Sequence, residues 1–443
     1  MSKSSDPEKM GVSQVVSSIS EDPALTRDIV GLEFYEQAQE FSPEELDAEY
    51  KRVLRKLDFR ILPILCVCYT LQFLDKLSLN YAAAYSLKED LGLVGQRYSW
   101  VAAIFNFGYL AGALPANYII QRVSVAKFTG VSLIIWAIIL IGHVGAKNYG
   151  GLLVLRFLLG VMEAGISPSC MMICGLFYHK DAQPMRMATF LSCNGVATMV
   201  GALLGYGLGH AKNPHIKSWQ LIFMVIGLVN FVWSFFFLWL CPDSPVEAKF
   251  LTDREKAVVI EKVSQNSMGI KDKTFKKYQI VEAVSDITVW LLVFGGLGCG
   301  VINGGSSNFQ SALIKGFGFS GLNATALQLP TGAIEWVCVF AAGIACAIYR
   351  DMRCIMIVAL SIPPFAGLIG IRTIGLEHKW ALVGCTWLQY LIGGPVIFQW
   401  MCLNANVAGY SKKTISNGLW FMFYAAGNII GANIFYAKQA PRY

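Results

Sequence analysis

The apolar residues of this chain gather into long runs that are separated by short polar segments. A run of about 20 apolar residues is the length of α-helix that crosses the hydrocarbon core of a bilayer. Such runs predict eleven membrane-spanning helices, at residues 61–84, 97–120, 127–146, 150–174, 186–210, 217–241, 288–313, 323–349, 352–373, 379–404 and 412–437. The pattern therefore predicts an all-α membrane protein.

The N-terminal segment departs from this pattern. Residues 1–40 are rich in Ser, Glu and Asp and show no periodicity, so we expect them to be disordered. Ser42, followed by Pro43 and by Glu45 three residues after the cap, predicts a helix that starts with a capping box. We expect this helix to be amphipathic and to lie along the inner membrane surface, so that residues 1–60 form a cytosolic tail. No signal peptide is expected, because no short apolar stretch with a cleavage site precedes it.

The second long polar segment lies between the sixth and seventh apolar runs and carries charges of both signs. It predicts a cytosolic linker between two helical bundles. The expected organisation after the tail is a six-helix bundle, a linker and a second bundle, at residues 61–241, 242–287 and 288–443.

The two halves share a small-residue pattern. The fifth helix opens with Asn194-Gly195 and the eleventh with Asn417-Gly418, and each continues with further glycines: Gly201, Gly205, Gly209, Gly427 and Gly431. Small residues at four-residue spacing allow helices to approach closely, and matching positions favour a six-plus-six repeat. Chance is the alternative, because the chain holds 42 glycines. A six-plus-six repeat requires a twelfth helix, which we interpret as lost by truncation because the chain ends just past the eleventh.

Composition and charge agree with the membrane assignment. Of the 443 residues 55% are hydrophobic and only 15% charged, whereas soluble domains carry about 25% charged residues. The net charge of +7 does not indicate nucleic-acid binding, because the basic residues lie in short loops between apolar runs. Loops assigned to the inner side hold more of them than outer loops, which predicts a cytosolic N-terminus. The sequon at Asn323 then falls outside the cell, as a candidate glycosylation site.

Motifs for catalysis or cofactor binding are not found. The 12 cysteines have no metal-ligand spacing, and neither a nucleophile elbow nor a phosphate-binding loop with its Lys is present. The glycine-rich stretch 295–298 lies within an apolar run, where it indicates helix packing. We therefore expect no enzyme, no cofactor and no metal, and an ion gradient as the energy source for any transport.

Charged residues inside the apolar runs carry the candidate chemistry. Each costs about 2.5–3.5 kcal/mol at mid-membrane, so its presence indicates a function. The first helix holds Asp75 and Lys76, and the fourth holds Arg156 and Glu163. Seven residues separate Arg156 from Glu163, which places both on one face about 10.5 Å apart along the axis. We expect them to face one cavity with Asp75 and Lys76; a buried salt-bridge network that only fixes helix packing is the alternative.

Polar uncharged residues recur in the second half. Those expected to contact a substrate are Asn303, Asn308 and Gln310 in the seventh helix and Gln399 and Asn404 in the tenth. Each is equally well explained as a hydrogen-bonding contact between helices.

Four segments of the chain match a known pattern: residues 50–58, 74–76, 156–168 and 241–252. They resemble the major facilitator superfamily, specifically the anion:cation symporter family and its fungal allantoate-permease-like branch, and the resemblance covers residues 46–437. It implies a fold of two six-helix bundles around a central cavity, and proton-driven uptake of small organic anions. The substrate range includes allantoate, ureidosuccinate, nicotinate, pantothenate and biotin.

The resemblance also implies roles for particular residues. It makes Asp75 and Glu163 proton carriers and Lys76 and Arg156 partners of the substrate. Lys76 departs from the Arg that bacterial and animal relatives usually have, and a lysine binds a carboxylate less specifically than the planar fork of an arginine. An inner gate is implied at four residues in two loops: Arg122, Arg350, Asp351 and Arg353. The first of these loops keeps basic groups but lacks the usual Asp-Arg signature.

The sequence thus predicts a proton-coupled symporter, acting as a monomer, that imports a small carboxylate across a fungal plasma membrane. Two alternatives stay open. A drug or cation antiporter of the same fold would expel its substrate, and a nutrient-sensing receptor would bind a ligand without accumulating it.

Overall fold

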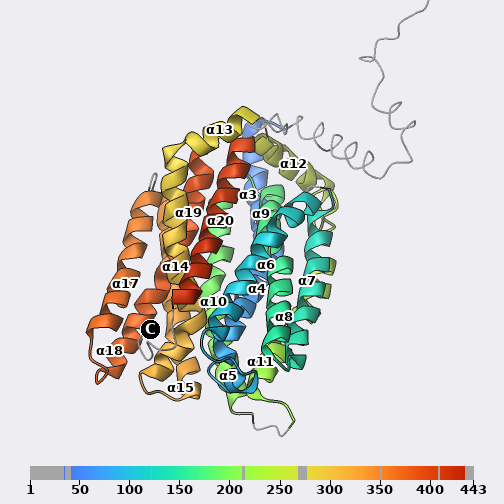
Figure 1. The fold of residues 1–443 in the computed structure, drawn as a ribbon. Helices are drawn as coiled ribbons and strands as arrows, with labels where there is room; N and C mark the ends of the chain where they lie inside the picture. Colours follow the sequence, from blue (N-terminus) through green and yellow to red (C-terminus); the bar gives the residue numbers. More distant parts are fainter. Residues whose placement is uncertain are drawn as a thin grey trace, which may run out of the picture.

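The computed structural model describes residues 34, 41–120, 122–211, 215–267, 277–349, 352–407 and 410–434, in which every regular element is a helix (Figure 1). Nearly all of the tail expected to be disordered, and the predicted inner-gate residues Arg350 and Asp351, lie outside these residues.

Ten helical stretches in the described part are long and apolar enough to cross a membrane. They are Pro43–Ala82, Arg97–Ile120, Val125–Gly145, Tyr149–Phe177, Gln183–Gly209, Ser218–Leu240, Ile287–Gly316, Gly321–Cys346, Arg353–Thr373 and Lys379–Asn406. All ten fall at the predicted places. At the eleventh place lies α20 (Tyr410–Ile434), a 25-residue helix that Asn417, Asn428 and Asn433 make more polar than the others.

Five of these stretches contain more than one helix. The first joins α3 (Pro43–Arg60) to α4 (Leu62–Ala82) through Ile61, which keeps helical backbone angles. The predicted capping box at the start of α3 is confirmed: the Ser42 hydroxyl accepts from the Glu45 N–H at 3.3 Å, and the Glu45 carboxylate accepts from the Ser42 N–H at 3.2 Å. The other composite stretches are α7 (Val125–Gly142) with η2 (His143–Gly145), α8 (Tyr149–Glu163) with α9 (Ile166–Phe177), α15 (Gly321–Ala326) with α16 (Leu329–Ile348), and α18 (Lys379–Gln389), η3 (Tyr390–Ile392) and α19 (Gly393–Asn406).

The remaining helices of the first half and linker are α5 (Leu87–Asp90), α6 (Arg97–Ile120), α10 (Gln183–Gly209), α11 (Ser218–Leu240) and α12 (Asp253–Ser267). Those that follow are α13 (Lys277–Ser285), α14 (Ile287–Gly316) and α17 (Arg353–Thr373). The helices α3, α12 and α13 gather at one end of the bundle, here named the linker end, and α5, α15 and α18 lie at the other, the far end (Figure 1).

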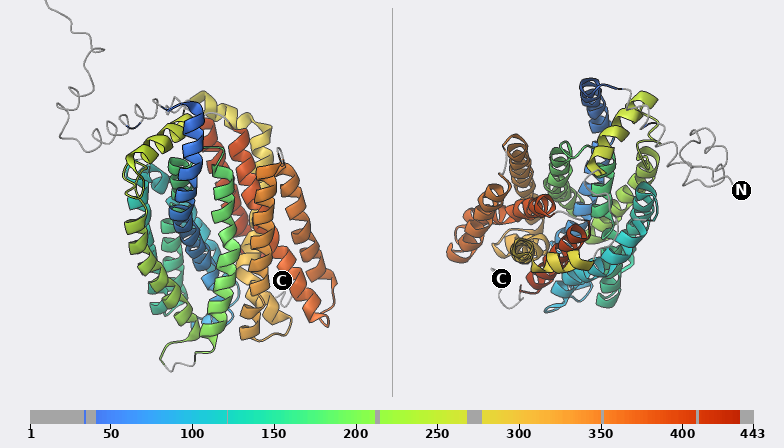
Figure 2. Two further views of the ribbon diagram at one scale, coloured as in Figure 1. Left: turned by 180° about the vertical axis from the view of Figure 1, so that it is seen from behind. Right: turned by 90° about the horizontal axis from the view of Figure 1, so that it is seen from above.

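The two halves of the chain lie on opposite sides of the molecule when it is viewed along the helices (Figure 2). They meet mainly where α10 packs on α16 and α15, α6 on α20, and α4 on α14. Within the halves, α4 packs on α10 and α14 packs on α20. These are the first and fifth long helices of each half, which is the repeat that the glycine pattern indicated.

Glycines allow the closest of these approaches. A Cβ on Gly195 of α10 would overlap the backbone of Gly332 on α16, and the reverse also holds, so both halves need a glycine at this crossing. On α14, Gly300 and Gly304 face the backbone of α20, whose Gly427 and Gly431 face back. The predicted role of the α20 glycines in close packing is thereby confirmed, whereas Gly418 faces open space.

Ion pairs tie helices together at the linker end. The Arg186 guanidinium donates two hydrogen bonds to Asp58, of 3.0 and 2.7 Å, which joins α10 to α3. Lys56 of α3 lies 2.7 Å from Glu255 of α12. In the second half, Lys412 Nζ lies 2.8 Å from an Asp286 oxygen, and the hydrogen bond from Lys412 is the largest cause that lowers the pKa of Asp286. The linker end of each half is thus held by charge.

We predict that Gly304→Ala destabilises the protein by about 1–3 kcal/mol, because the new methyl would lie 2.7 Å from Cα of Asn428 and overpack the α14–α20 crossing. The matched control is Gly298→Ala, the same change six residues earlier on α14, where no atom lies within 4 Å of the new Cβ. Thermal unfolding in detergent measures both variants. Equal melting temperatures would show that this crossing does not require glycine.

Candidate functional site: a polar cavity between the two halves

A central cavity of about 130 Å³ lies between the halves. First-half helices α4, α6, α8, α9 and α10 form one wall, and α14, α16, η3, α19 and α20 form the other. Its polar lining residues are Gln72, Lys76, Asn106, Glu163, Ser167, Asn194, Asn303 and Glu335. Aromatic side chains provide most of the rest: Tyr69, Phe73, Phe105, Tyr109, Tyr390, Trp400, Trp420, Phe421 and Tyr424. A small, largely apolar cavity with a few converging polar groups is typical of a site for a small molecule.

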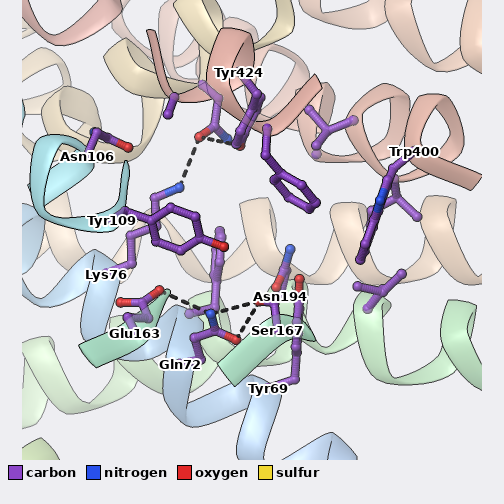
Figure 3. Close-up of a pocket in the computed structure, with 18 of the residues that line it drawn as sticks. Tyr69, Gln72, Lys76, Asn106, Tyr109, Glu163, Ser167, Asn194, Trp400 and Tyr424 are labelled. Carbon is purple, nitrogen blue, oxygen red and sulfur yellow. Dashed lines mark hydrogen bonds between the residues drawn. The ribbon is translucent and has the colours of Figure 1, made fainter. Parts of the chain in front are cut away.

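Lys76 is the one cation among the described residues that line this cavity. It extends from α4, and its Nζ donates to the Asn303 side-chain oxygen of α14 at 3.2 Å (Figure 3). The Tyr424 hydroxyl of α20 donates to the same oxygen at 3.1 Å. Among the described residues no carboxylate lies within ion-pair distance of Lys76, so its charge is stabilised by neutral groups. Such a cation is available to an anionic ligand.

Glu163 faces the same cavity at the break between α8 and α9. The Gln72 amide of α4 donates to one Glu163 oxygen at 3.2 Å and to the Ser167 hydroxyl at 2.9 Å (Figure 3). The other Glu163 oxygen is buried and has no hydrogen-bond partner in the described structure. This carboxyl group therefore retains the capacity to bind a proton or a ligand.

Asp75 and Arg156, two further predicted site residues, lie outside the central cavity. Asp75 is completely buried and accepts a 2.6 Å hydrogen bond from the Trp136 indole of α7 and a weaker one, of 3.4 Å, from Ser78. Arg156 donates to the same Ser78 hydroxyl at 3.2 Å and lies over the Phe223 ring. Because consecutive helical residues are rotated by about 100°, Asp75 faces α7 and α8 while Lys76 faces the cavity. Ser78 links Asp75 to Arg156 behind the site.

Of the five polar residues predicted in the second half, Asn303 lines the central cavity. The others lie elsewhere. Asn308 lines a neighbouring void of about 10 Å³ together with Arg156 and Lys76. Gln310 donates to Thr331 of α16 at 3.0 Å, and the Gln399 amide lies 3.4 Å from the Cys299 sulfur.

Glu335 on α16 is a cavity residue that the sequence analysis missed. It is buried, with 2% of its surface exposed, and it lines the cavity from the second half. The signal was present, because Glu335 is the one acidic residue between Leu329 and Ile348. A carboxylate in such an apolar run costs as much to bury as Glu163 does, so the sequence marks it as a candidate site residue. The tyrosines of the lining were also missed, since aromatic residues in apolar runs have no distinct pattern.

A second pocket, of about 360 Å³, opens at the linker end. It is lined by Lys180, Arg353, Asn404 and Lys413, and it shares Leu191 and Trp400 with the central cavity. Two of the predicted site residues, Asn404 and Arg353, thus lie at this mouth. Arg122, also predicted at the inner gate, stacks over the Tyr118 ring on the outer side of α6.

Hydrogen bonds between the halves close the far end. The Asn80 amide of α4 donates to Gln328 at 2.7 Å, and its oxygen accepts from the Ser311 N–H at 2.9 Å. The Tyr98 hydroxyl of α6 donates to the carbonyl of Asn308 at 2.7 Å. Hydrogen bonds close the far end, and the second pocket opens at the linker end. The access route to the cavity is therefore from the linker end.

Comparison with known proteins places this architecture. The family model of the Major Facilitator Superfamily matches residues 65–432. An uncharacterized transporter of Schizosaccharomyces pombe is 39% identical over 90% of this chain and 75% of its own length. The allantoate permease of Saccharomyces cerevisiae is 34% identical over 92% of this chain and 77% of its own. A thiamine pathway transporter of the same yeast is 33% identical over 92% and 77%.

Solved structures agree on the fold. A bacterial homolog of the human lysosomal transporter Spinster superposes with a TM-score of 0.62 at 18% identity, covering 84% of this chain and 80% of that one. The fold and its central cavity thus define a membrane transporter rather than an enzyme. The chain belongs to the Major Facilitator Superfamily, and its relatives include the fungal allantoate permease.

Proposed function

We propose that this protein is a proton-coupled symporter that imports a small organic carboxylate by alternating access. The observation that carries the proposal is the unpaired cation of Lys76 in an enclosed cavity that also holds Glu163. A bound anion neutralises the charge of Lys76. A proton on Glu163 removes the repulsion that the ionised Glu163 carboxylate would exert on that anion. The two ligands together neutralise Lys76 and Glu163.

Asp75 and Arg156 support this site from behind. Through Trp136 and Ser78 they hold the middle of α4, and so they position Lys76 toward the cavity. The mouth pocket with its three cations provides the route by which a bound anion leaves at the linker end. The allantoate permease of Saccharomyces cerevisiae is 34% identical to this chain, which makes allantoate the first compound to test.

A drug or cation antiporter is the second candidate. It is favoured by the charges on the cavity wall, where Glu163 and Glu335 outnumber Lys76. The direction of transport distinguishes the two candidates.

The orientation proposed for the chain places the linker end in the cytosol of a plasma-membrane protein. Basic residues gather at that end, among them Lys127, Lys180, Arg353 and Lys413, which is the bias expected of cytosolic loops. The predicted glycosylation residue Asn323 is exposed on α15, at the far end.

Cys354 tests this orientation. It is the exposed one of the twelve cysteines and follows Arg353 at the start of α17. We predict that a membrane-impermeant maleimide labels the protein strongly in permeabilised cells and weakly in intact ones. Cys354→Ser should remove the difference. Equal labelling of intact and permeabilised cells would place this end outside.

Uptake tests the transport proposal directly. We predict that yeast cells expressing the chain accumulate at least one member of a labelled carboxylate panel headed by allantoate, and that a protonophore abolishes the accumulation. Expulsion of preloaded compounds would instead support the antiporter, and saturable binding without flux would support a receptor.

Glu163→Gln should separate coupling from transport. The amide keeps the hydrogen-bonding shape but cannot carry the proton, so we predict that the inside-to-outside ratio of the carboxylate falls to about one while exchange across the membrane continues. Gln310→Leu, a buried change outside the cavity, is the control and should accumulate substrate. Full uphill transport by Glu163→Gln would refute the role of Glu163.

A further inference from the structure

Glu335 is a cavity residue for whose side chain the described structure shows no hydrogen bond or ion pair. Its side chain is 2% exposed, and one of its carboxylate oxygens is buried with no hydrogen-bond partner in the described structure. Within the described residues no cation lies within ion-pair distance of it. A buried polar atom left without a partner is costly, and such atoms in native proteins call for an explanation. One explanation is a ligand that supplies the missing donor.

The surrounding backbone makes room for this carboxylate. Gly332, one turn before Glu335, packs against Gly195 of α10 and fixes the position of α16. Opposite the side chain lies Gly393 at the start of α19, where a Cβ would overlap the Glu335 carboxylate. A glycine on each side therefore holds the carboxylate at the cavity wall rather than within a packed core.

Lys76 and Glu335 extend into the cavity from opposite halves of the protein, the first from α4 and the second from α16. Lys76 presents N–H donors to a ligand, and Glu335 presents acceptors. A ligand that satisfies both carries an acceptor anion at one end and an N–H donor at the other. A plain carboxylate satisfies Lys76 alone and leaves the Glu335 oxygen unpaired.

We propose that Glu335 selects carboxylates that also carry an N–H donor, such as a ureido or amide group, by accepting a hydrogen bond from it. This inference rests on the proposed function, because it assumes that the carboxylate of the substrate binds Lys76. A substrate of this kind bridges the two halves. A compound of the same shape that lacks the N–H group binds more weakly, because it leaves the Glu335 oxygen without a hydrogen bond.

Two inhibitors that differ only in N–H groups test the proposal. In 5-oxohexanoate, CH₂ and CH₃ replace the NH and NH₂ of 3-ureidopropionate. Each compound competes with uptake of the labelled carboxylate that the wild type accumulates. In the wild type we expect the ureido compound to inhibit uptake at a concentration about tenfold or more below that needed of its isostere. In Glu335→Leu we expect this ratio of inhibitory concentrations to fall to about one.

Three further variants make the result specific. Thr331→Val, which removes a buried hydroxyl one turn away on α16, should keep the ratio. Lys76→Gln should weaken both inhibitors by a similar factor, because both contain the carboxylate. If Glu335→Leu does not reach the membrane, Glu335→Gln, which keeps one acceptor, should reduce the ratio by about threefold.

The outcomes separate this inference from the proposed function. If the wild type accumulates carboxylates but both compounds inhibit its uptake equally, the role of Glu335 alone is overturned. The same holds if the Glu335→Leu variant keeps the wild-type ratio. A wild type that accumulates no carboxylate and is bound by neither compound overturns both.

Discussion

The cost of placing ionised groups in the hydrocarbon layer governs how the middle of this protein is built. Each such group costs about 2.5–3.5 kcal/mol unless neighbours compensate it. Among the described residues, five charged side chains lie in the middle of the long apolar helices: Asp75, Lys76, Arg156, Glu163 and Glu335. Asp75 accepts hydrogen bonds from the Trp136 indole and the Ser78 hydroxyl, and Arg156 donates to the same hydroxyl while its buried Nε has no partner in the described structure. The other three side chains line the central cavity. Their place at the cavity, and not the completeness of their hydrogen bonding, separates the proposed site from its supporting framework.

The two sets are connected through α4. Asp75 and Lys76 are adjacent in the chain and face different ways, so the bonds that hold Asp75 also set the direction of Lys76. Arg156 reaches the same part of α4 through Ser78. In the proposed function, a change at Asp75 or Arg156 thus acts on the ligand through the orientation of Lys76, and both are positioning residues.

The sequence predicts the fold better than the site, and the reason is physical. A membrane-spanning helix must satisfy its backbone hydrogen bonds internally and expose about 20 apolar residues, so length and composition alone locate it. Which side chains face a cavity depends on helix rotation and on the neighbours, which a single sequence does not record. Asp75 and Lys76 show this, because a pattern that finds both cannot say which one faces the ligand. Asn303 and Gln310 carry the same amide group and lie on one helix, yet Asn303 lines the cavity while Gln310 donates a hydrogen bond to Thr331. Glu335 has the same burial cost, but it stands alone in its apolar run, whereas the predicted charged residues occur two to a helix.

The distribution of bond types along the molecule bears on how it can switch. The ion pairs observed at the linker end lie within one half or between it and the linker, as between Arg186 and Asp58 or Lys412 and Asp286. The hydrogen bonds that close the far end join the halves; those of Asn80 and Tyr98 are neutral, and the Lys315 ammonium donates one to the carbonyl of Ala84. A neutral hydrogen bond contributes about 0.5–1.5 kcal/mol net, since water replaces the partner when it breaks. Opening the far end therefore costs a few kcal/mol, which is the scale on which a ligand with different affinities for two conformations shifts their populations. In the proposed alternating access, ion pairs therefore hold each half together, while a few hydrogen bonds between the halves break and form as the halves move about the site.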